Sequence, residues 1–526
     1  MIKTDIRVGI GYGADDIKNA LCLHLPISKD EIGEIKILKK VLKLDGKAEY
    51  ALSVGVSFSA EREAGLLKMK KKVFECESYD FEIRKRPFDA SPVVVGAGPA
   101  GLFAALGLAE AGACPIVIER GESVEQRAKT VSEFFSRGIL SEESNIQFGE
   151  GGAGAFSDGK LKYGAMDKYK HKVLREFING GAPEDIIYTV GAHLGTDKLP
   201  IIVKSIREKI ISLGGSFIFS ARVCGIDIKD GKLRAITYEK NNEVHRIETD
   251  RAIFATGHSA KDTFELLYSS GALMESRGFG IGMRVEHKRE YINRLVYGDE
   301  ALADTVGTAS YHLVTHLPGG RSVYSFCMCP GGEVVAAASG KGGIVTNGMS
   351  EYARHGDNSN AAILVSVSRD DFESDHPLAG IELQRRIERE AFAVAGGDYS
   401  APVIALSDFL SDNSPSALGA VKPSYRVGTS LCRPEKYLPG YISESMKAGF
   451  ADFDAWMPGF SMPDAVLTGP ETRSTSPVRV LRGKDFSAVG IRGLYPVGEG
   501  AGYAGGIVSS ATDGLRAAEA IANEKC

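Results

Sequence analysis

Residues 92–120 read PVVVGAGPAGLFAALGLAEAGACPIVIER and decide the fold. The apolar residues at the start of this stretch are typical of a strand buried on both faces, and the turn after them carries Gly96, Gly98 and Gly101. In this pattern the first glycine permits a tight turn, the second lets the backbone approach a pyrophosphate, and the third lets a helix pack closely on the strand. The helix predicted over 102–111 would turn its N-terminal amides and partial positive charge toward those phosphates. We therefore expect a Rossmann-type dinucleotide-binding domain of the α/β class.

A second predicted strand, 115–118, ends in Glu119, about 20 residues after the first glycine of the turn. A carboxylate at this place accepts hydrogen bonds from both ribose hydroxyls and repels a 2′-phosphate. A glycine-rich turn that only packs a helix on a sheet would leave this acid unexplained. Strand, turn, helix and acid together indicate a bound dinucleotide.

Two later segments favour FAD over NAD. The segment RAIFATGHS predicts a strand that ends in Thr256-Gly257 and returns the chain beneath the cofactor. Residues 493–521, GLYPVGEGAGYAGGIVSSATDGLRAAEAI, predict a buried strand, then Glu499, then a helix that begins near Gly506. Because FAD extends beyond the half that it shares with NAD, a second element must hold its ribitol and ring, and a carboxylate can accept a ribitol hydroxyl. The helix at Gly506 would point its positive end at the flavin edge where negative charge collects on reduction.

Further motifs carry a resemblance to known flavoproteins. They are FGEGGAGAFSDGKL at 148–161, ATGHSAKDTFE at 255–265, YSFCMCPGG at 324–332 and the C-terminal segment. With the dinucleotide turn they resemble the glutathione-reductase-like flavoprotein superfamily and, more closely, a bacterial family of FAD-dependent dehydrogenases; the likeness covers roughly residues 90–526. The chain differs from the superfamily at Gly498-Glu499, where Gly-Asp is usual. We expect the longer acid to move the ribitol contact without abolishing it.

The resemblance implies that the glycine-rich loop 148–161 lies against the cofactor. Glycine amides can approach the flavin or the pyrophosphate closely, and a cation such as Lys160 near the ring would stabilise reduced, anionic flavin. A surface lysine after a turn is the alternative for Lys160. Arg127, on the helix after Glu119, would reach a phosphate or lie on a solvated helix face. The full set expected at the cofactor is Gly96, Gly98, Pro99, Ala100, Gly101, Glu119, Arg120, Arg127, Gly151, Gly152, Ser157, Asp158, Lys160, Val223, Thr256, Gly257, Gly498, Glu499, Gly506 and Ile507.

Proteins of this kind are expected to split the FAD-binding domain around an inserted α+β substrate domain. The expected bounds are 89–270 and 485–526 for the FAD-binding domain and 271–484 for the insert. Arg284, Glu286 and His287 would stand near the start of the insert, the first two on one face of a strand and His287 on the other. An ion pair or a solvated strand explains these residues without a ligand. The catalytic residues therefore stay open.

Cys327 and Cys329 invite a redox interpretation, since alternation along a strand would put both on one face. Residues two apart in an extended strand lie about 6.5 Å apart between their Cα atoms, at the outer edge of disulfide geometry. We therefore interpret them as buried structural thiols. The ten histidines are dispersed, and His312 with His316 is an isolated pair, so no metal site is predicted.

The sequence predicts no second dinucleotide fold. The segment GFGIGMR at 278–284 lacks the third glycine, and GKGGIVTNG at 340–348 is followed by neither a helix nor a distant ribose acid. A nicotinamide that reduced the flavin would have to dock transiently. Reduction by the substrate or by a protein donor is the alternative.

Residues 1–88 predict a separate unit whose β-α-β-β-α-β order is typical of a ferredoxin-like fold. Its expected strands are 5–11, 34–42, 50–58 and 73–83, and its expected helices are 14–23 and 61–72. RNA recognition is disfavoured, because the basic-Gly-aromatic signature of an RNA-recognition motif is absent. A docking or dimerising role, and with it a homodimer, is the expectation.

Composition sets outer bounds on the function. The chain has 526 residues, a formal net charge of -5, 43% hydrophobic and 25% charged residues. This length allows two or three domains, and no apolar run reaches the roughly 18 residues that a membrane helix requires. The N-terminus carries no secretory signal, so we expect a cytoplasmic protein with reduced thiols, no membrane and no stable nucleic-acid partner.

Three functions agree with these features. The first is an FAD-dependent oxidoreductase, a dehydrogenase or reductase that acts on a small substrate or an electron carrier. The second is an RNA-modifying flavoenzyme that uses the N-terminal unit as its RNA handle. The third is a non-catalytic flavin-binding redox module whose insert is an interaction surface.

Overall fold

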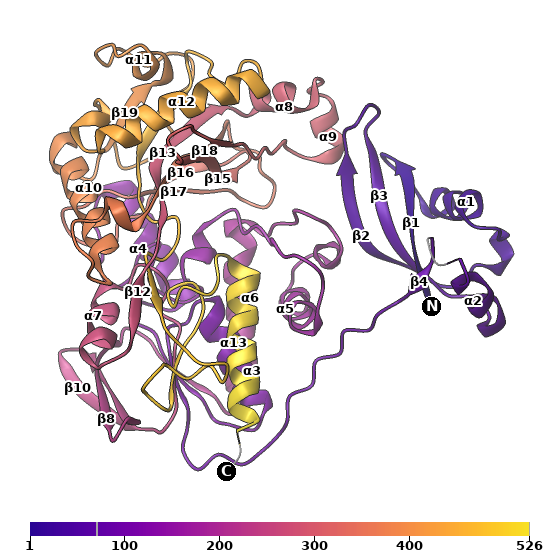
Figure 1. Ribbon diagram of the computed structural model, residues 1–526, viewed down its shortest axis with the longest axis horizontal. Helices are drawn as coiled ribbons and strands as arrows, with labels where there is room; N and C mark the ends of the chain where they lie inside the picture. Colours follow the sequence, from indigo (N-terminus) through magenta and orange to yellow (C-terminus); the bar gives the residue numbers. More distant parts are fainter. Residues whose placement is uncertain (70–71, 525–526) are drawn as a thin grey trace.

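The computed structural model describes residues 1–69 and 72–524. A large body contains two main sheets, and a small N-terminal unit stands to one side of it at the end of an extended segment (Figure 1). The helix expected over 61–72 and the domain expected to reach 526 each include residues outside this description. The mixed α/β class is confirmed.

The glycine turn follows strand β5 of a five-stranded parallel sheet, whose order is β23-β11-β5-β6-β7. The strands are β5 (Val93–Val95), β6 (Ile116–Ile118), β7 (Ser216–Ile218), β11 (Ala252–Phe254) and β23 (Leu494–Pro496). Strand β23 comes from the C-terminal end of the chain and pairs with β11, so the C-terminal segment closes the same sheet as the glycine turn.

Two helices lie side by side on this sheet, α3 (Pro99–Glu110) after β5 and α13 (Ile507–Ala522) after β23 (Figure 1). Val94 packs on the face of the sheet that these two helices cover. Val93 and Val95 pack on the opposite face, against a three-stranded antiparallel sheet. That sheet consists of β8 (Arg222–Lys229), β9 (Lys232–Lys240) and β10 (Glu243–Glu248). The other helices of this half are α4 (Val124–Arg137), α5 (Lys168–Asn179), α6 (Gly195–Ser212) and α7 (Lys261–Ser269).

The second main sheet has seven strands in the order β14-β15-β18-β13-β21-β19-β20. They are β13 (Phe279–Lys288), β14 (Val314–His316), β15 (Ser322–Cys329), β18 (Asn358–Val367), β19 (Ala401–Ala405), β20 (Thr429–Leu431) and β21 (Val466–Glu471). Two small sheets flank it, β12 (Met274–Ser276) with β22 (Val478–Val480) and β16 (Glu333–Ala336) with β17 (Thr346–Met349).

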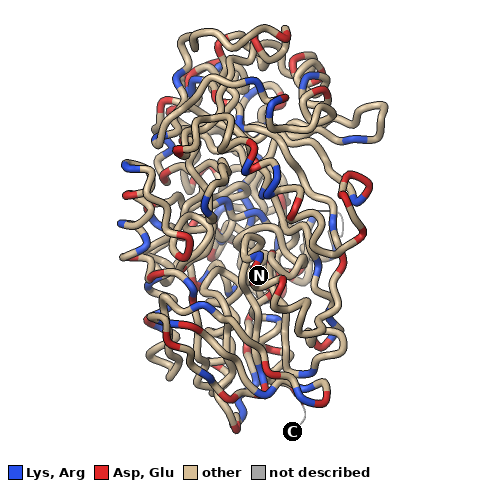
Figure 2. The backbone as a smooth tube through the Cα atoms, turned by 90° about the vertical axis from the view of Figure 1, so that its left-hand side faces the viewer, with Lys and Arg blue, Asp and Glu red and all other residues tan. Residues whose placement is uncertain are grey.

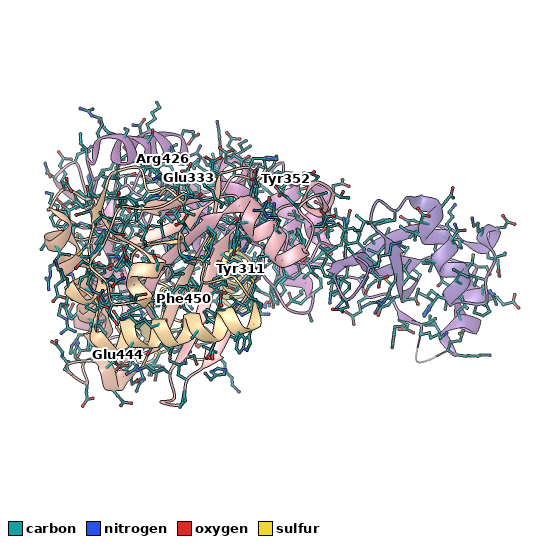
Figure 3. The ribbon with its side chains drawn as sticks, turned by 90° about the horizontal axis from the view of Figure 1, so that it is seen from above. Tyr311, Glu333, Tyr352, Arg426, Glu444 and Phe450 are labelled. Atoms are coloured by element: carbon teal, nitrogen blue, oxygen red, sulfur yellow. The ribbon has the colours of Figure 1, made fainter. Side chains whose placement is uncertain are left out.

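Helices pack over this sheet and enclose an apolar core that includes the buried Phe450 (Figure 3). They are α8 (Arg289–Tyr297), α10 (Ala379–Ala395), α11 (Leu406–Leu410) and α12 (Gly440–Trp456). The short helix α9 (Leu302–Val306) follows α8 and contributes no buried residue. Away from this core, Glu333 and Arg426 form a partly exposed ion pair of 2.6 Å (Figure 3).

The N-terminal unit has its own core and a four-stranded sheet in the order β2-β3-β1-β4. Its elements are β1 (Ile2–Gly9), α1 (Ala14–His24), β2 (Ile35–Lys43), β3 (Glu49–Val56), α2 (Ala60–Leu67) and β4 (Phe74–Glu75). The last strand, expected over 73–83, is thus much shorter, because the chain leaves the sheet and runs toward the body. The edge strand β2 touches the body: the Lys40 amide donates to the Tyr188 carbonyl oxygen (2.7 Å), and the Val190 amide donates to that of Lys40 (3.0 Å).

Charges of both signs are interspersed along the backbone in the side view (Figure 2). This distribution agrees with the small formal net charge of -5. Among residues 1–69 and 72–524, no helix combines the length and the apolar character needed to cross a membrane.

Helices α3 and α13 approach each other through small residues, and this contact gives a stability prediction. A Cβ at Gly514 would overlap the carbonyl oxygen of Ala100, and one at Gly107 would lie 2.8 Å from the Cβ of Ala518. We expect Gly514→Ala to lower the free energy of unfolding by about 1–3 kcal/mol through overpacking, measured by denaturant unfolding followed by circular dichroism. Gly440→Ala is the control, because nothing lies within 4 Å of the added methyl group. An unchanged midpoint for Gly514→Ala would contradict the close packing.

Candidate functional site

One large cavity opens where the C-terminal ends of β5, β11 and β23 face the seven-stranded sheet. The parallel-sheet half contributes the turns after these three strands and the glycine-rich loop. The facing half contributes Phe326, Cys327, Asn347, Glu471, Arg473 and Ser474. A ligand in this cavity would therefore contact both halves of the body.

The cavity gathers the residues that the sequence analysis proposed, except Gly101, Arg127 and Gly151. Those in its lining are Gly96, Gly98, Pro99, Ala100, Glu119, Arg120, Gly152, Ser157, Asp158, Lys160, Val223, Thr256, Gly257, Gly498, Glu499, Gly506 and Ile507. They come from six separate segments, so the tertiary fold assembles them.

The three glycines of the dinucleotide turn have different surroundings. A Cβ at Gly96 would lie 2.5 Å from the carbonyl oxygen of Ala255, and one at Gly101 would overlap the carbonyl oxygen of Gly96. A Cβ at Gly98 would meet only the Cα of Gly152, at an unstrained 3.7 Å, and would project into the cavity. The first and third glycines thus serve the packing of the turn, whereas the second keeps the cavity open.

Two helix N-termini open into this cavity. Helix α3 is capped by Gly98 and α13 by Gly506, and neither cap has a side-chain hydrogen bond. Nothing lies within 4 Å of a Cβ built at Gly505, and only the Ser509 hydroxyl approaches one at Gly506, at 3.9 Å. Backbone amides at both helix starts can therefore reach an anionic or electron-rich ligand.

Glu119 is nearly buried at the cavity wall, with 5% of its surface exposed. Its carboxylate accepts hydrogen bonds from the amides of Ala97 (2.7 Å), Gly121 (2.9 Å) and Gly149 (3.0 Å). These bonds fix the turn and the glycine-rich loop relative to each other. Carboxylate oxygens keep further acceptor capacity, so a ribose hydroxyl remains compatible with this position.

Arg127 corrects the sequence analysis, because neither of its two expected positions occurs. It is fully buried and does not line the cavity. Its guanidinium donates to backbone carbonyl oxygens of the loop at 2.7–3.2 Å, those of Asn145, Ile146, Gly149, Glu150 and Gly152. Arg127 therefore holds the glycine-rich loop from the side away from the cavity.

Lys160 lies at the cavity and not on the open surface, with 19% of its side chain exposed. Its ammonium group donates to the carbonyl oxygen of Met328 and lies 3.9 Å from Asp158, which also binds Arg354. Burial lowers the pKa of Lys160, and the charge of Asp158 opposes that shift. The alternative of a surface lysine is wrong.

Arg284 lies fully buried in the seven-stranded sheet, so the solvated-strand alternative is wrong for it. Its guanidinium binds both carboxylate oxygens of Glu471, at 2.5 and 3.0 Å, and the side-chain oxygen of Asn360 at 2.7 Å. Burial alone would lower the pKa of Arg284, but the Glu471 carboxylate raises it above its ordinary value. Arg284 thus supports the wall through Glu471, which lines the cavity.

Glu286 and His287 are also fully buried and do not line the cavity. The Glu286 carboxylate accepts from the hydroxyl of Ser424 (2.5 Å) and the amide group of Asn358 (3.0 Å). The His287 Nε2 atom lies 2.8 Å from the carbonyl oxygen of Phe460. The solvated alternative is therefore wrong for these two residues as well.

Several lining residues escaped the sequence analysis. His258 directly follows Thr256-Gly257 after strand β11, so its place in the sequence could have predicted that it lines the cavity. Burial lowers the pKa of His258 to about 4. Asn347 and Arg473 come from distant segments with no motif. The Arg473 guanidinium is held by Glu388 at 2.7 and 2.9 Å.

Comparisons with known proteins agree with this architecture. Residues 91–140 match a model described as FAD binding domain, and residues 278–474 match one described as FAD-dependent protein, C-terminal domain-like. An uncharacterized protein of Clostridium beijerinckii is 44% identical over 528 residues, which cover 98% of each chain. This chain belongs to that family of FAD-dependent proteins. Its cofactor is FAD.

Solved structures show more distant similarity. The 3-ketosteroid-delta4-(5alpha)-dehydrogenase of Rhodococcus jostii is 13% identical with a TM-score of 0.36, covering 84% of this chain and 100% of that one. The quinol fumarate reductase FrdA of E. coli is 13% identical with a TM-score of 0.34, covering 82% of this chain and 69% of that one.

The lining residues fit FAD in the chemistry of their donors and acceptors. The open glycine backbones of the dinucleotide turn and of α13 can donate amides to the pyrophosphate and to the ring. Glu499 lines the cavity, and its carboxylate has no hydrogen-bond partner among residues 1–69 and 72–524. Burial raises its pKa to about 7, with a contribution from the negative charge of Cys327. A ribitol hydroxyl would satisfy this acceptor.

The surroundings of Gly98 predict that Gly98→Val abolishes FAD binding. Its backbone is ordinary and its Cβ is unstrained, so the variant should fold but present two methyl groups to the pyrophosphate. We expect a colourless protein whose far-ultraviolet circular dichroism matches the parent, with FAD released on denaturation measured by absorbance. Gly440→Val, at an exposed helix start, should stay yellow. Full occupancy in Gly98→Val would refute this placement of the pyrophosphate.

Glu499→Gln should weaken FAD binding in a pH-dependent way. The variant keeps an acceptor oxygen but loses the charge-assisted part of the bond to ribitol, about 1–2 kcal/mol or roughly ten-fold in affinity. Because the pKa of Glu499 is raised to about 7, the parent carries this charge above pH 7 and loses it below. The ratio of affinities should therefore grow as pH rises through 7, in fluorescence titrations of the apoprotein. Glu351→Gln, an exposed residue, is the control; a ratio near one at high pH would rule out the contact.

Proposed function

We propose that this FAD-dependent protein is an oxidoreductase, a dehydrogenase or reductase, that acts on a small substrate or electron carrier held between the flavin and the seven-stranded sheet. The observation that carries the proposal is the shared cavity. The segment that matches the FAD binding domain and the segment that matches the C-terminal family domain line it together. A partner held by the second domain would thus lie against a cofactor held by the first.

The chain supplies the charge and proton control that such a reaction needs. FAD, when bound, supplies the two-electron chemistry. Lys160 offers a positive charge at the cavity, and Glu499, with a pKa of about 7, can take up or release a proton near neutral pH. His258 stays neutral there, since its pKa is about 4. We propose Lys160 and Glu499 as the groups that tune the reduced cofactor.

The finer architecture belongs to the same proposal. We propose a Rossmann-type FAD-binding domain, related to the glutathione-reductase-like superfamily, at 89–270 and 485–526 with an insert at 271–484. The pairing of β23 with β11 supports the split. We propose a ferredoxin-like unit at 1–88, supported by the strand order β2-β3-β1-β4, with a docking or dimerising role in a cytoplasmic protein.

The test is anaerobic reduction of the purified holoprotein with the small-molecule fraction of a cell extract. We expect saturable bleaching of the flavin band by at least one fraction and recovery on adding an electron acceptor. Arg473→Ala, which alters the wall opposite the dinucleotide turn, should raise the concentration needed for half-maximal bleaching. If every fraction acts no faster on the holoprotein than on free FAD, the protein is a non-catalytic flavin module and the proposal fails.

Free NADH and NADPH should reduce this flavin poorly. The segment GFGIGMR forms no phosphate-binding turn, because Gly280 and Gly282 lie inside strand β13, where a Cβ at Gly282 would overlap the carbonyl oxygen of Ile363. Stopped-flow bleaching near 450 nm, the usual flavin band, measures the effect. Free FAD is the baseline. Saturable, fast reduction by either nicotinamide would reveal a docking site and contradict this prediction.

A further inference from the structure

Strand β15 ends in an irregularity that places two thiols together. Its pairing with β18 runs regularly to Phe326 opposite Ala362 and then shifts, so that Cys329 stands opposite Asn360. Cys327 occupies the extra position with φ +42°, a left-handed conformation that is uncommon for a residue with a side chain. The alternation assumed for a regular strand is therefore wrong here. The Cys329 thiol donates a hydrogen bond to the carbonyl oxygen of Cys327, 3.2 Å from its sulfur, and lowers the pKa of the Cys327 thiol.

The two thiols differ in access. Cys327 is partly exposed and lines the FAD cavity, whereas Cys329 is fully buried behind it. Cys327 also acts electrostatically on Glu499, the residue expected at the ribitol. One thiol thus lines the cofactor cavity, and the other is closed to solvent.

Charged groups of both signs lie near the pair, and two cations contact its backbone. The Arg284 guanidinium lies 3.1 Å from the carbonyl oxygen of Cys327 and 4.0 Å from the sulfur of Cys329. The Lys160 ammonium group donates to the carbonyl oxygen of Met328, between the two cysteines. The charged groups that act on the pair from all sides are Arg284, Lys160, Asp158, Glu471 and Glu499.

The charge distribution favours a thiolate on Cys327. The hydrogen bond from Cys329 lowers the pKa of Cys327 to about 5; burial opposes this shift, and the charges of Arg284 and Lys160 support it. The same hydrogen bond and burial raise the pKa of Cys329. A reactive cysteine has this kind of partly exposed, electropositive environment.

We propose that Cys327 and Cys329 are a redox-active pair that exchanges two electrons with the flavin, and that the substrate is a dithiol. The inference rests on the proposed oxidoreductase function and names the class of its substrate. In the internal step the Cys327 thiolate and the Cys329 thiol would form one S–S bond and release two electrons and one proton, and oxidised FAD would take these up as its anionic reduced form. In the external step a substrate thiolate attacks the sulfur of Cys327 and Cys329 leaves. The second substrate thiol then releases Cys327, so that the substrate dithiol becomes a disulfide.

The spacing of the pair suits thiol exchange. A disulfide between residues two apart closes a short ring, and strained disulfides are the labile ones. Such a bond would exchange readily with an external dithiol. This proposal departs from the sequence interpretation of two structural thiols because the bulge, absent from a regular strand, places Cys327 in the cavity lining and the Cys329 thiol against the backbone of Cys327.

The first experiment follows the cysteines themselves. In the anaerobic holoprotein with oxidised flavin and no added thiol, rapid alkylation and mass spectrometry should find a Cys327–Cys329 disulfide, with one flavin reduced for each disulfide formed. In the apoprotein, alkylation of Cys327 should change little between pH 6 and 8, as its pKa of about 5 requires. The exposed Cys224 serves as the comparison. Partial burial raises the pKa of its thiol, so its alkylation rate should rise about ten-fold for each pH unit. A pair that stays a dithiol beside oxidised flavin overturns the proposal.

The second experiment follows the flavin with dithiothreitol as the probe dithiol. Anaerobic bleaching should be saturable, and Cys327→Ser and Cys329→Ser should each slow it about ten-fold or more while retaining FAD. The control Cys224→Ser should match the parent. Equal bleaching in all four proteins overturns the cysteine proposal but leaves the oxidoreductase function intact. A flavin that neither dithiothreitol nor any extract fraction reduces overturns both.

Discussion

Where the chain passes from strand β5 to helix α3, neighbouring backbone atoms leave no room for side chains, and the site depends on this close packing. Gly96 and Gly101 meet backbone atoms of Ala255 and of Gly96 itself, and Gly514 brings α13 equally close to Ala100. These contacts hold both helix starts at the same edge of the parallel sheet. Because the first amides of a helix lack partners within it, both sets remain available to a ligand in one cavity.

The cavity walls are stiffened by buried ion pairs. Arg284 with Glu471, Arg354 with Asp158 and Arg473 with Glu388 each join two segments that are remote in sequence. Buried pairs of this kind contribute little net stability, because desolvation offsets most of the attraction, but breaking one leaves a buried charge. Their effect is to fix which side chains face the ligand. Glu499 stands apart from them as an acid without a cation at its carboxylate.

Local patterns predicted the parts of the site that act through the backbone. The spacing of Gly96, Gly98 and Gly101 and the acid at Glu119 follow from steric and phosphate-binding rules, and the structure places helix α3 and strand β6 within three residues of the predictions. The buried position of Arg127 was not predicted, because its partners are backbone carbonyl groups of a loop and no sequence pattern indicates such contacts.

The cavity residues contributed by the half with the seven-stranded sheet could not be predicted from the sequence, for a different reason. Asn347 and Arg473 reach the cavity only through long-range strand pairing. The bulge at Cys327 uses a non-glycine residue in the left-handed region, where the sequence carries no turn signal. Regular alternation fails in this strand because it is locally irregular, and the irregularity lies at the two thiols.

The positions of Glu499 and Cys327 couple the charge of the cavity to its redox state. Each is an acid near the same cofactor site, and the negative charge of Cys327 raises the pKa of Glu499. While Cys327 is a thiolate, Glu499 therefore tends to hold its proton; once the sulfur is in a disulfide, that charge is gone and the proton is released more easily. Oxidation of the pair would thus free a proton beside the flavin at the step in which the flavin takes up electrons. Two acids with opposed pKa shifts in one cavity would thus exchange charge as the pair changes its redox state.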